Sequence, residues 1–381
     1  MTLLLSSTPA LAQRQGASLG MQTGVVADSV SREQDVTSAG GNGGWFAKSE
    51  AEMNGGRARV QWRIDGSSQI RQVPGIRSMG WDQQSANGAL TLRASRVTTF
   101  DVSGAVQWSP RFSVGLPRAN DADPVAVIEL PSMNSLTSRF GGHLVHAFSR
   151  RRTGDAAYTA ERVAASGRTL VTQRISTGVR QQLQRKFSLV VKQSAVRRSS
   201  STDSGRELSD TLETTVGLSR DIGATTSFTV AAIPSVFRRE SPEGQARATV
   251  HLGGGATVER RWSGAWRTTF SMQQSVLSGE GDTTPVYARS IGGSMNGRVG
   301  RLIVTGSITR VIGGASENGA RNHGGQSLMV TAAHPVTRRA MLAAEYQQTK
   351  VHSAATDASG LDGGLQGRRL RVTVTSTLTR R

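Results

Sequence analysis

Cysteine is absent from this 381-residue chain, which excludes disulfide bridges and thiolate metal sites. Lysine is nearly absent as well, since only Lys48, Lys186, Lys192 and Lys350 occur, and aromatic residues make up 5%. No apolar run approaches the roughly 18 residues that a membrane-spanning helix needs. If the chain enters a membrane, it must therefore do so with strands.

Positive charge is what the chain has in excess, with a formal net charge of +19 carried almost entirely by Arg. Such an excess attracts anions, although a biased genomic base composition also produces it. A nucleic-acid binder usually concentrates its charge in a patch or a tail. Here Arg is scattered along the whole sequence, so we expect no nucleic-acid partner.

Apolar and polar residues alternate along much of the chain, as the last such stretch illustrates. Leu370, Val372 and Val374 share one face of a strand there, whereas Arg371 and Thr373 share the other. The alternation continues for 10–13 residues in several stretches, longer than the typical soluble strand of about five or six residues. It matches the roughly 9–11 tilted residues with which a strand crosses a bilayer.

The stretches that alternate, or are otherwise compatible with strands, span residues 45–53, 57–65, 89–107, 111–118, 124–131, 136–150, 166–179, 184–198, 207–219, 225–239, 245–259, 264–278, 286–297, 300–312, 324–334, 338–352 and 366–379. The stretch 66–87 contains Pro74 and several Gly and is expected to be a long loop. Short Arg-bearing turns, such as Arg180-Gln181-Gln182, alternate with polar, Gly-rich connections, such as 199–206. This regular alternation of short and long connections predicts one up-and-down antiparallel sheet.

The apolar face of these strands is rich in Ala, Val and Gly. A soluble sandwich would fill its core with large Leu, Ile and Phe side chains, whereas small residues suffice where lipid fills the gaps. The polar face would then line a water-filled lumen. The sequence therefore predicts an all-β transmembrane barrel over residues 45–381.

The N-terminal sequence MTLLLSSTPALAQ has a short apolar stretch, and Ala10-Leu11-Ala12 precedes Gln13 in the manner of a signal-peptidase site. Residues 1–12 are therefore interpreted as the truncated remnant of a signal peptide. Residues 13–44 have no periodicity and end in Gly40-Gly41-Asn42-Gly43-Gly44. We expect them to form a flexible periplasmic lead-in or a small plug.

With this start, the recurring hairpins and the final amphipathic strand Gly367–Thr379, the chain resembles a Gram-negative outer-membrane β-barrel of the porin-like kind. The resemblance implies a transmembrane antiparallel up-and-down barrel of about 16 strands (range 14–18) in the cell outer membrane. It also implies short turns that face the periplasm and long loops that face outward. The chain ends in Leu378-Thr379-Arg380-Arg381, where such barrels commonly end in Phe or Trp.

Residues for catalysis or metal binding are not arranged in any recognised pattern. No nucleophile elbow, Walker loop or dinucleotide-binding loop occurs in the required context. His143 and His146 are three residues apart, which places them on opposite faces of a strand. We therefore expect no catalytic site, no metal site and no cofactor, and we do not expect an enzyme.

Charged residues on the polar faces are the candidate lumen-lining set: Arg174, Arg247, Arg267, Arg371, Glu213, Glu259 and Glu345. An excess of Arg there would give a modest preference for anions. The alternative is that opposing Arg and Glu side chains pair across strands as structural ladders.

A second set of arginines lies at the predicted short turns: Arg111, Arg180, Arg185, Arg220, Arg260, Arg261, Arg298, Arg301, Arg338, Arg339, Arg380 and Arg381. Turn residues are usually only solvated. The alternative is that these side chains extend to the anionic head groups of phospholipids.

The function favoured by these observations is a passive outer-membrane pore for small solutes, with anionic solutes as the favoured class. One alternative is a non-conducting structural, adhesive or secretion-associated barrel. A second is a soluble exported β-rich protein that binds polyanions. The implied partners are outer-membrane lipids and solutes in the lumen, and a homo-oligomer is left open.

Overall fold

The computed structural model describes residues 16–32, 40–72, 79–115, 127–165, 167–202, 205–240, 246–277, 286–313, 324–337, 339–352 and 365–380. The proposed signal-peptide remnant, residues 1–12, lies outside them. The described residues contain no helix that is long and apolar enough to cross a membrane.

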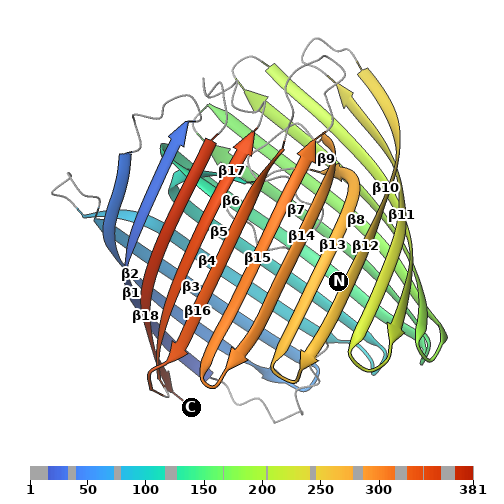
Figure 1. The fold of residues 1–381 in the computed structure, drawn as a ribbon, viewed down its shortest axis with the longest axis horizontal. Coiled ribbons are helices and arrows are strands. Elements are labelled where there is room, and N and C mark those ends of the chain that lie inside the picture. The colour runs from blue at the N-terminus through green and yellow to red at the C-terminus, as the bar shows by residue number, and fades with distance from the viewer. Residues whose placement is uncertain are drawn as a thin grey trace.

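In the described ranges, eighteen antiparallel strands form a single sheet (Figure 1). In chain order they are β1 (Gly16–Arg32), β2 (Gly40–Arg57), β3 (Val60–Gln72), β4 (Met79–Arg93), β5 (Thr98–Gly115), β6 (Val127–Ser149), β7 (Arg152–Ala165), β8 (Arg168–Gln184), β9 (Phe187–Thr202), β10 (Gly205–Ile222), β11 (Thr226–Glu240), β12 (Ala246–Ser263), β13 (Trp266–Leu277), β14 (Val286–Val299), β15 (Leu302–Gly313), β16 (Gly324–Pro335), β17 (Ala340–His352) and β18 (Leu365–Arg380).

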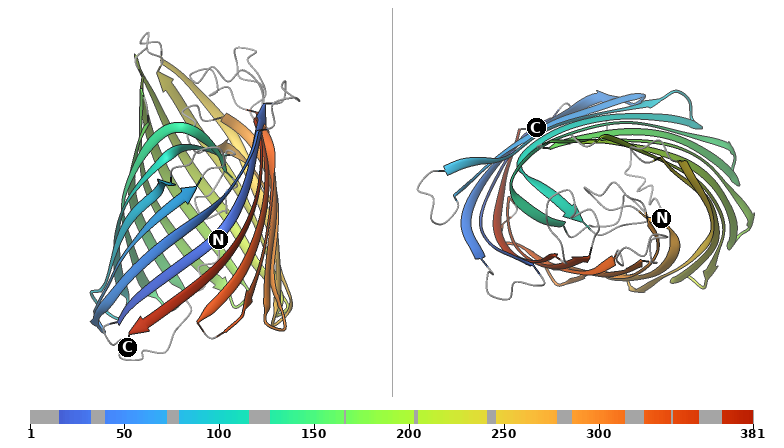
Figure 2. Two further views of the ribbon diagram at one scale, coloured as in Figure 1. Left: turned by 90° about the vertical axis from the view of Figure 1, so that its left-hand side faces the viewer. Right: turned by 90° about the horizontal axis from the view of Figure 1, so that it is seen from above.

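The sheet is closed into a barrel by the pairing of its first and last strands. β1 pairs with β18 from Ala17 opposite Arg380 to Arg32 opposite Leu365, and its other edge pairs with β2. Seen from above, the strands form a flattened ring (Figure 2). Closure matters because an open edge would leave unpaired backbone N–H and C=O groups, which lipid cannot satisfy.

The predicted fold class is confirmed, with a strand count at the upper end of the expected range. The assignment of residues 13–44 to a lead-in or plug is corrected, because Gly16–Arg32 is β1 and β2 begins at Gly40. The expected loop 66–87 is instead mostly the end of β3 and the start of β4. β7 was also missed, because alanines on both of its faces hide the alternation.

The short connections also differ in detail from the prediction. Arg180-Gln181-Gln182 lies inside β8, and the turn follows at Arg185 and Lys186. The expected long connection 199–206 is almost entirely strand, because β9 ends at Thr202 and β10 begins at Gly205. The short turns gather at one end of the barrel, the lower end in Figure 1.

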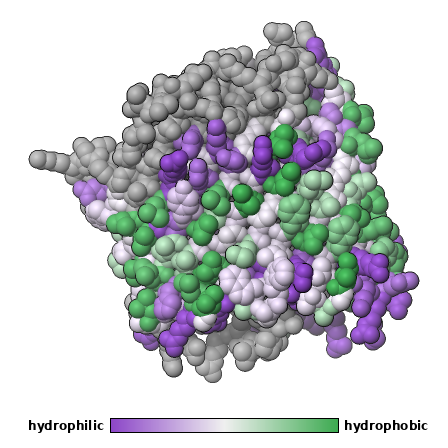
Figure 3. Space-filling view, viewed as in Figure 1, coloured by the Kyte–Doolittle hydropathy of each residue, from purple (hydrophilic) through white to green (hydrophobic). Residues whose placement is uncertain are grey.

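Large apolar side chains cover the outside of the barrel instead of filling a core. Val250 and Leu252 of β12, for example, are 78% and 77% exposed. Among the described residues, the only buried hydrophobic side chains are Phe46, Ile233, Ala288 and Val311. The space-filling view shows apolar side chains over the middle of the wall, with hydrophilic ones toward its ends (Figure 3). An exposed apolar belt of this extent is suited to lipid.

β5 and β6 extend beyond the wall as a two-stranded ribbon that curves into the barrel (Figure 2). The pairing from Arg111 opposite Pro131 to Gly115 opposite Val127 continues the β5–β6 ladder past a register shift between Ser109 and Arg111. Pro110 lies at this shift and has no N–H to donate, which favours a bend there. β6 also contacts β18, which is not its neighbour in the ring. Within the stretches 111–118 and 124–131, expected as separate strands, the described residues 111–115 and 127–131 are thus the ends of β5 and β6.

Close approach of a side chain to backbone is clearest where Trp266 of β13 lies opposite Gly297 of β14. A Cβ atom added to Gly297 would lie 2.1 Å from Cε3 of the indole. The ring therefore covers the glycine backbone, and no larger residue fits without displacement of Trp266.

We expect Gly297→Ala to destabilise the barrel by about 1–3 kcal/mol, the usual cost of overpacking. The matched control is Gly88→Ala in β4, because a Cβ there meets nothing within 4 Å. Urea unfolding of vesicle-embedded barrels, followed by gel mobility without heating, measures the difference. Equal midpoints for the two variants would contradict the assigned contact.

Candidate functional site: the charged lumen

The inner face of the barrel is polar because the side chains between the exposed apolar residues point inward. In β12, Val250, Leu252 and Val258 are exposed on the outer face, so Thr257 and Glu259 lie on the inner face. Register carries this assignment around the ring, since residues directly opposite each other share a face. The candidate site is therefore the lumen as a whole.

Two of the predicted lumen-lining pairs lie on adjacent strands. Glu259 of β12 forms an ion pair with Arg267 of β13, in which Arg267 Nε lies 3.1 Å from Glu259 Oε1. Glu345 of β17 lies directly opposite Arg371 of β18. The Arg371 guanidinium carbon also lies 4.3 Å from the ring centre of Phe46, which is 1% exposed.

The other three predicted residues lie farther round the ring. Glu213 of β10 is half-buried. Its carboxylate is attracted electrostatically by the positive charges of Arg174 in β8 and Lys192 in β9. Arg247 lies near the loop-side end of β12, opposite Arg239. The seven residues thus share the inner face but form separate groups. Cross-strand pairing is present at Glu259 and Arg267, and the preference for anions stays a prediction.

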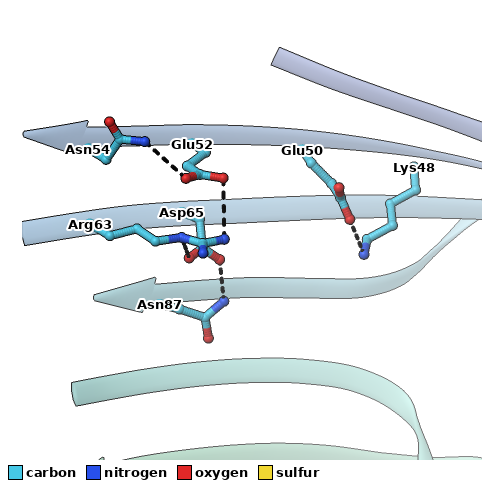
Figure 4. Close-up of polar contacts among 7 residues, drawn as sticks. All are labelled: Lys48, Glu50, Glu52, Asn54, Arg63, Asp65 and Asn87. Atoms are coloured by element: carbon cyan, nitrogen blue, oxygen red, sulfur yellow. Dashed lines mark hydrogen bonds and ion pairs between the residues drawn. The ribbon is translucent and has the colours of Figure 1, made fainter. Parts of the chain in front are cut away.

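An acidic stretch of the inner wall was not anticipated. Arg63 of β3 lies between two carboxylates, with Nη2 3.2 Å from Glu52 Oε2 and Nε 3.3 Å from Asp65 Oδ1 (Figure 4). Nearby on β2, Lys48 Nζ lies 2.5 Å from Glu50 Oε1. Three carboxylates here face two cations, so this wall carries a local negative excess.

Amide groups hold these carboxylates in place. Asn87 of β4 donates to Asp65 at 2.7 Å, and Asn54 donates to Glu52 at 3.2 Å (Figure 4). Each of these two carboxylates thus has both Arg63 and an amide as partners, which fixes its position on the wall.

The charged inner face continues across the next strands. On β5, Asp101 accepts a hydrogen bond from Thr91 at 2.6 Å and lies 3.9 Å from Nδ1 of His143 on β6. Arg139 of β6 then pairs with Glu161 of β7, with Nε 2.8 Å from Oε2. The alternating spacing of Lys48, Glu50 and Glu52 was the available sequence signal for this wall.

Inward-facing residues are most tightly covered in the loop-side half of the lumen. Side chains that are less than 9% exposed lie there on strands all around the ring: Phe46, Arg71, Ser200, Ser209, Ser235, Ser275, Val311, Gln347 and Thr349. The β5–β6 ribbon enters the lumen from the same end. The inner wall is therefore least solvent-exposed toward the loop side, where the ribbon enters.

The histidines do not combine into a metal site. His143 lies beside Asp101 on the inner face, whereas His146 contacts Thr98 and Phe148 near a short turn. In the part of the chain that the structure describes, no group of three or more His, Cys, Asp or Glu side chains is placed to hold a metal ion.

We expect Arg63→Gln to make the lumen more cation-selective, because Glu52 and Asp65 lose their shared counter-charge. Reversal potentials in a tenfold salt gradient measure the change. Arg238→Gln is the matched control, since Arg238 is exposed on the outer face and the charge change is the same. An identical shift in both variants would show that overall charge, and not the lumen, decides selectivity.

The fold matches solved outer-membrane barrels along almost the full chain. OpdQ of Pseudomonas aeruginosa superimposes with a TM-score of 0.53 at 12% identity, over 96% of this chain and 98% of that one. OccAB4 of Acinetobacter baumannii gives 0.51 at 11%, over 98% and 100%. The FrpB iron transporter of Neisseria meningitidis gives 0.55 at 9%, over 97% and 82%.

Searches of protein-family models and of curated proteins found no match to this sequence. At such low identity, the structural matches establish the fold. They confirm the expected architecture, a closed antiparallel β-barrel.

Proposed function

We propose that this chain resides in the outer membrane of a Gram-negative bacterium and forms a passive channel for small solutes. The observation that carries the proposal is the division of the closed wall between its two faces. Exposed Val, Leu and Ile side chains form the outer face, whereas paired Arg, Lys, Asp and Glu side chains form the inner one. Charged groups of this density need water, and a hydrated lumen across a membrane is a pathway for solutes.

The size of the solutes follows from what occupies the lumen. The β5–β6 ribbon curves into the barrel, and the buried inner side chains lie at the same end. A channel narrowed in this way admits small solutes and excludes folded proteins. Similarity in fold to porins such as OpdQ supports the same class of function.

The finer proposal is a modest preference for anions. Arg174, Arg247 and Arg267 on the inner face favour anions, whereas the carboxylates near Arg63 oppose them. Positive and negative groups are interleaved along the wall, as at Arg267 beside Glu259 and at Arg63 beside Asp65, so neither sign fills the lumen. We therefore expect selectivity for anions to be weak.

The alternatives differ in what they require of the outer face and of the lumen. A soluble polyanion-binding protein would not expose apolar side chains over the whole outside of the ring. A non-conducting barrel is distinguished by electrical recording.

Recording from the refolded full-length chain in planar bilayers is the direct test, and stable conductance steps are expected. A folded barrel that inserts without conductance would contradict the proposed channel.

Removal of the inward ribbon should widen the passage. We expect a variant that lacks residues 112–130 to conduct at least about twofold more current per channel, because conductance rises as the narrowest section widens. The control is removal of residues 314–323 between β15 and β16, which leaves the β5–β6 ribbon intact. Unchanged conductance in the first variant would show that the ribbon does not limit the passage.

The anion preference is tested with the double variant Arg174→Gln and Arg267→Gln. We expect its permeability ratio of chloride to potassium to fall severalfold, because two cations leave the inner face while Glu213 and Glu259 remain. Reversal potentials in a potassium chloride gradient give the ratio. Cation selectivity of the unaltered channel would contradict this finer proposal and leave the channel itself intact.

A further inference from the structure

The short-turn end of the barrel carries a continuous series of exposed basic residues. Every short connection between an even-numbered strand and the next strand contributes at least one within or beside it: Arg57, Arg59, Arg93, Arg96, Arg150, Arg151, Arg152, Arg185, Lys186, Arg220, Arg260, Arg261, Arg298, Arg301 and Arg339. We call this set the arginine rim. Several lie at positions that the sequence placed inside or beside turns, and all are solvent-exposed.

Each of these turns also exposes a large apolar side chain next to its arginines. The apolar members, between 39% and 62% exposed, are Val60, Val97, Phe148, Leu183, Ile222, Trp262, Val299 and Val336. In a turn surrounded by water, an exposed apolar side chain gains no stabilisation from burial. In a turn at a membrane interface, the same side chain inserts toward the hydrocarbon. The pairing of Arg with an apolar neighbour at every turn is therefore the signature of an interface.

The positive charge of the rim is almost uncompensated within the chain. Asp221 is the one acidic residue in the stretches 57–60, 93–98, 148–152, 183–187, 220–226, 260–266, 298–302 and 336–340, with position 338 outside the described residues. Glu259 lies next to the rim, but its carboxylate is 3.1 Å from Arg267 of the inner face and 4.0 Å from Arg261. Arg298 donates from Nε to the Gly300 carbonyl at 2.7 Å, which leaves its positive charge uncompensated. The rim thus has excess positive charge with which to bind external anions.

We propose that the arginine rim is a binding surface for the phosphate groups of anionic phospholipids in the leaflet next to the short turns. The inference rests on the proposed membrane location and goes beyond channel function. Arg binds phosphate with several N–H donors, and anionic head groups lie at the height where the apolar wall ends. A nucleic acid would need the charge on a surface away from lipid, whereas the rim directly adjoins the apolar wall.

Two turns show how a head group would be held. Arg150, Arg151 and Arg152 follow one another beside exposed Phe148, so several guanidinium groups can meet one phosphate. At the β12–β13 turn, Arg260 lies over the ring of Trp262, with its Cζ atom 4.0 Å from the ring centre. The indole holds the cation at the interface while its own face contacts the acyl chains.

Native mass spectrometry of the full-length barrel in detergent micelles tests the proposal by counting bound phosphatidylglycerol and phosphatidylcholine. We expect several phosphatidylglycerol molecules to bind in preference to phosphatidylcholine. In the quadruple variant R150Q/R151Q/R260Q/R261Q, we expect the apparent affinity for phosphatidylglycerol to fall at least about tenfold. The preference should also weaken in 0.5 M salt, because the attraction is between exposed charges.

The matched control removes the same charge from the outer face at the loop-side end, with substitutions R162Q, R238Q, R289Q and R310Q. These arginines lie on four different strands, and Arg289 and Arg310 are the one pair among them on adjacent strands. Fewer of them can converge on one phosphate than at the rim, and we expect most of the bound phosphatidylglycerol to remain. Lysine at the four rim positions should retain the preference in part. Should the glutamine variant fail to fold, as seen by heat-modifiable gel mobility, the pair R260Q/R261Q provides the same comparison.

The proposal is overturned if the unaltered barrel shows no preference for phosphatidylglycerol, or if both quadruple variants lose it equally. Channel recording of the same samples separates this result from the proposed function. Conductance without lipid preference would refute the rim alone. Lipid preference in a barrel without conductance would refute the channel alone.

Discussion

The backbone of a chain in lipid must satisfy all of its own hydrogen bonds, and the rest of this structure depends on that requirement. Eighteen strands meet it only because β1 pairs with both β2 and β18. The closed ring leaves each strand with one face toward lipid and one toward the interior. Side-chain chemistry is then divided between the faces by alternation, and no conventional hydrophobic core is needed.

The division has a functional consequence, because the interior must hold groups that stay hydrated. Arg63, Glu52 and Asp65 form a fixed charged group in this interior, and the inward β5–β6 ribbon narrows it. In the proposed membrane location, the apolar wall and the arginine rim set the height of the ring independently of these inner groups. Selectivity and membrane position are therefore encoded in different residues of the same strands.

Much of the architecture could be predicted because alternate residues of a strand face opposite sides of a sheet. A wall with one apolar and one polar face therefore has a period-two pattern in the sequence. The inner-face placement of Arg267 and Glu259 followed from parity alone, and the structure adds their contact. β1, β4 and β7 were missed because Gly and Ala make both faces look alike there. The acidic wall was missed for a different reason: its charged residues lie in the expected strands 45–53 and 57–65, but alternation does not give the register that places Glu52 opposite Asp65. The inward ribbon was beyond prediction, because strands 111–115 and 127–131 have the same local pattern whether they lie in the wall or inside it.

The seam between β1 and β18 also bears on how the protein assembles. It joins residues separated by nearly the full described length of the chain, from Ala17 opposite Arg380 onward. Contacts of such large sequence separation form slowly, and the lumen has no complete wall until they exist. β6, one of the two strands of the ribbon, also contacts β18, so a strand that closes the ring also contacts a strand that enters the lumen. Closure of the wall and contact with the ribbon thus meet at one seam.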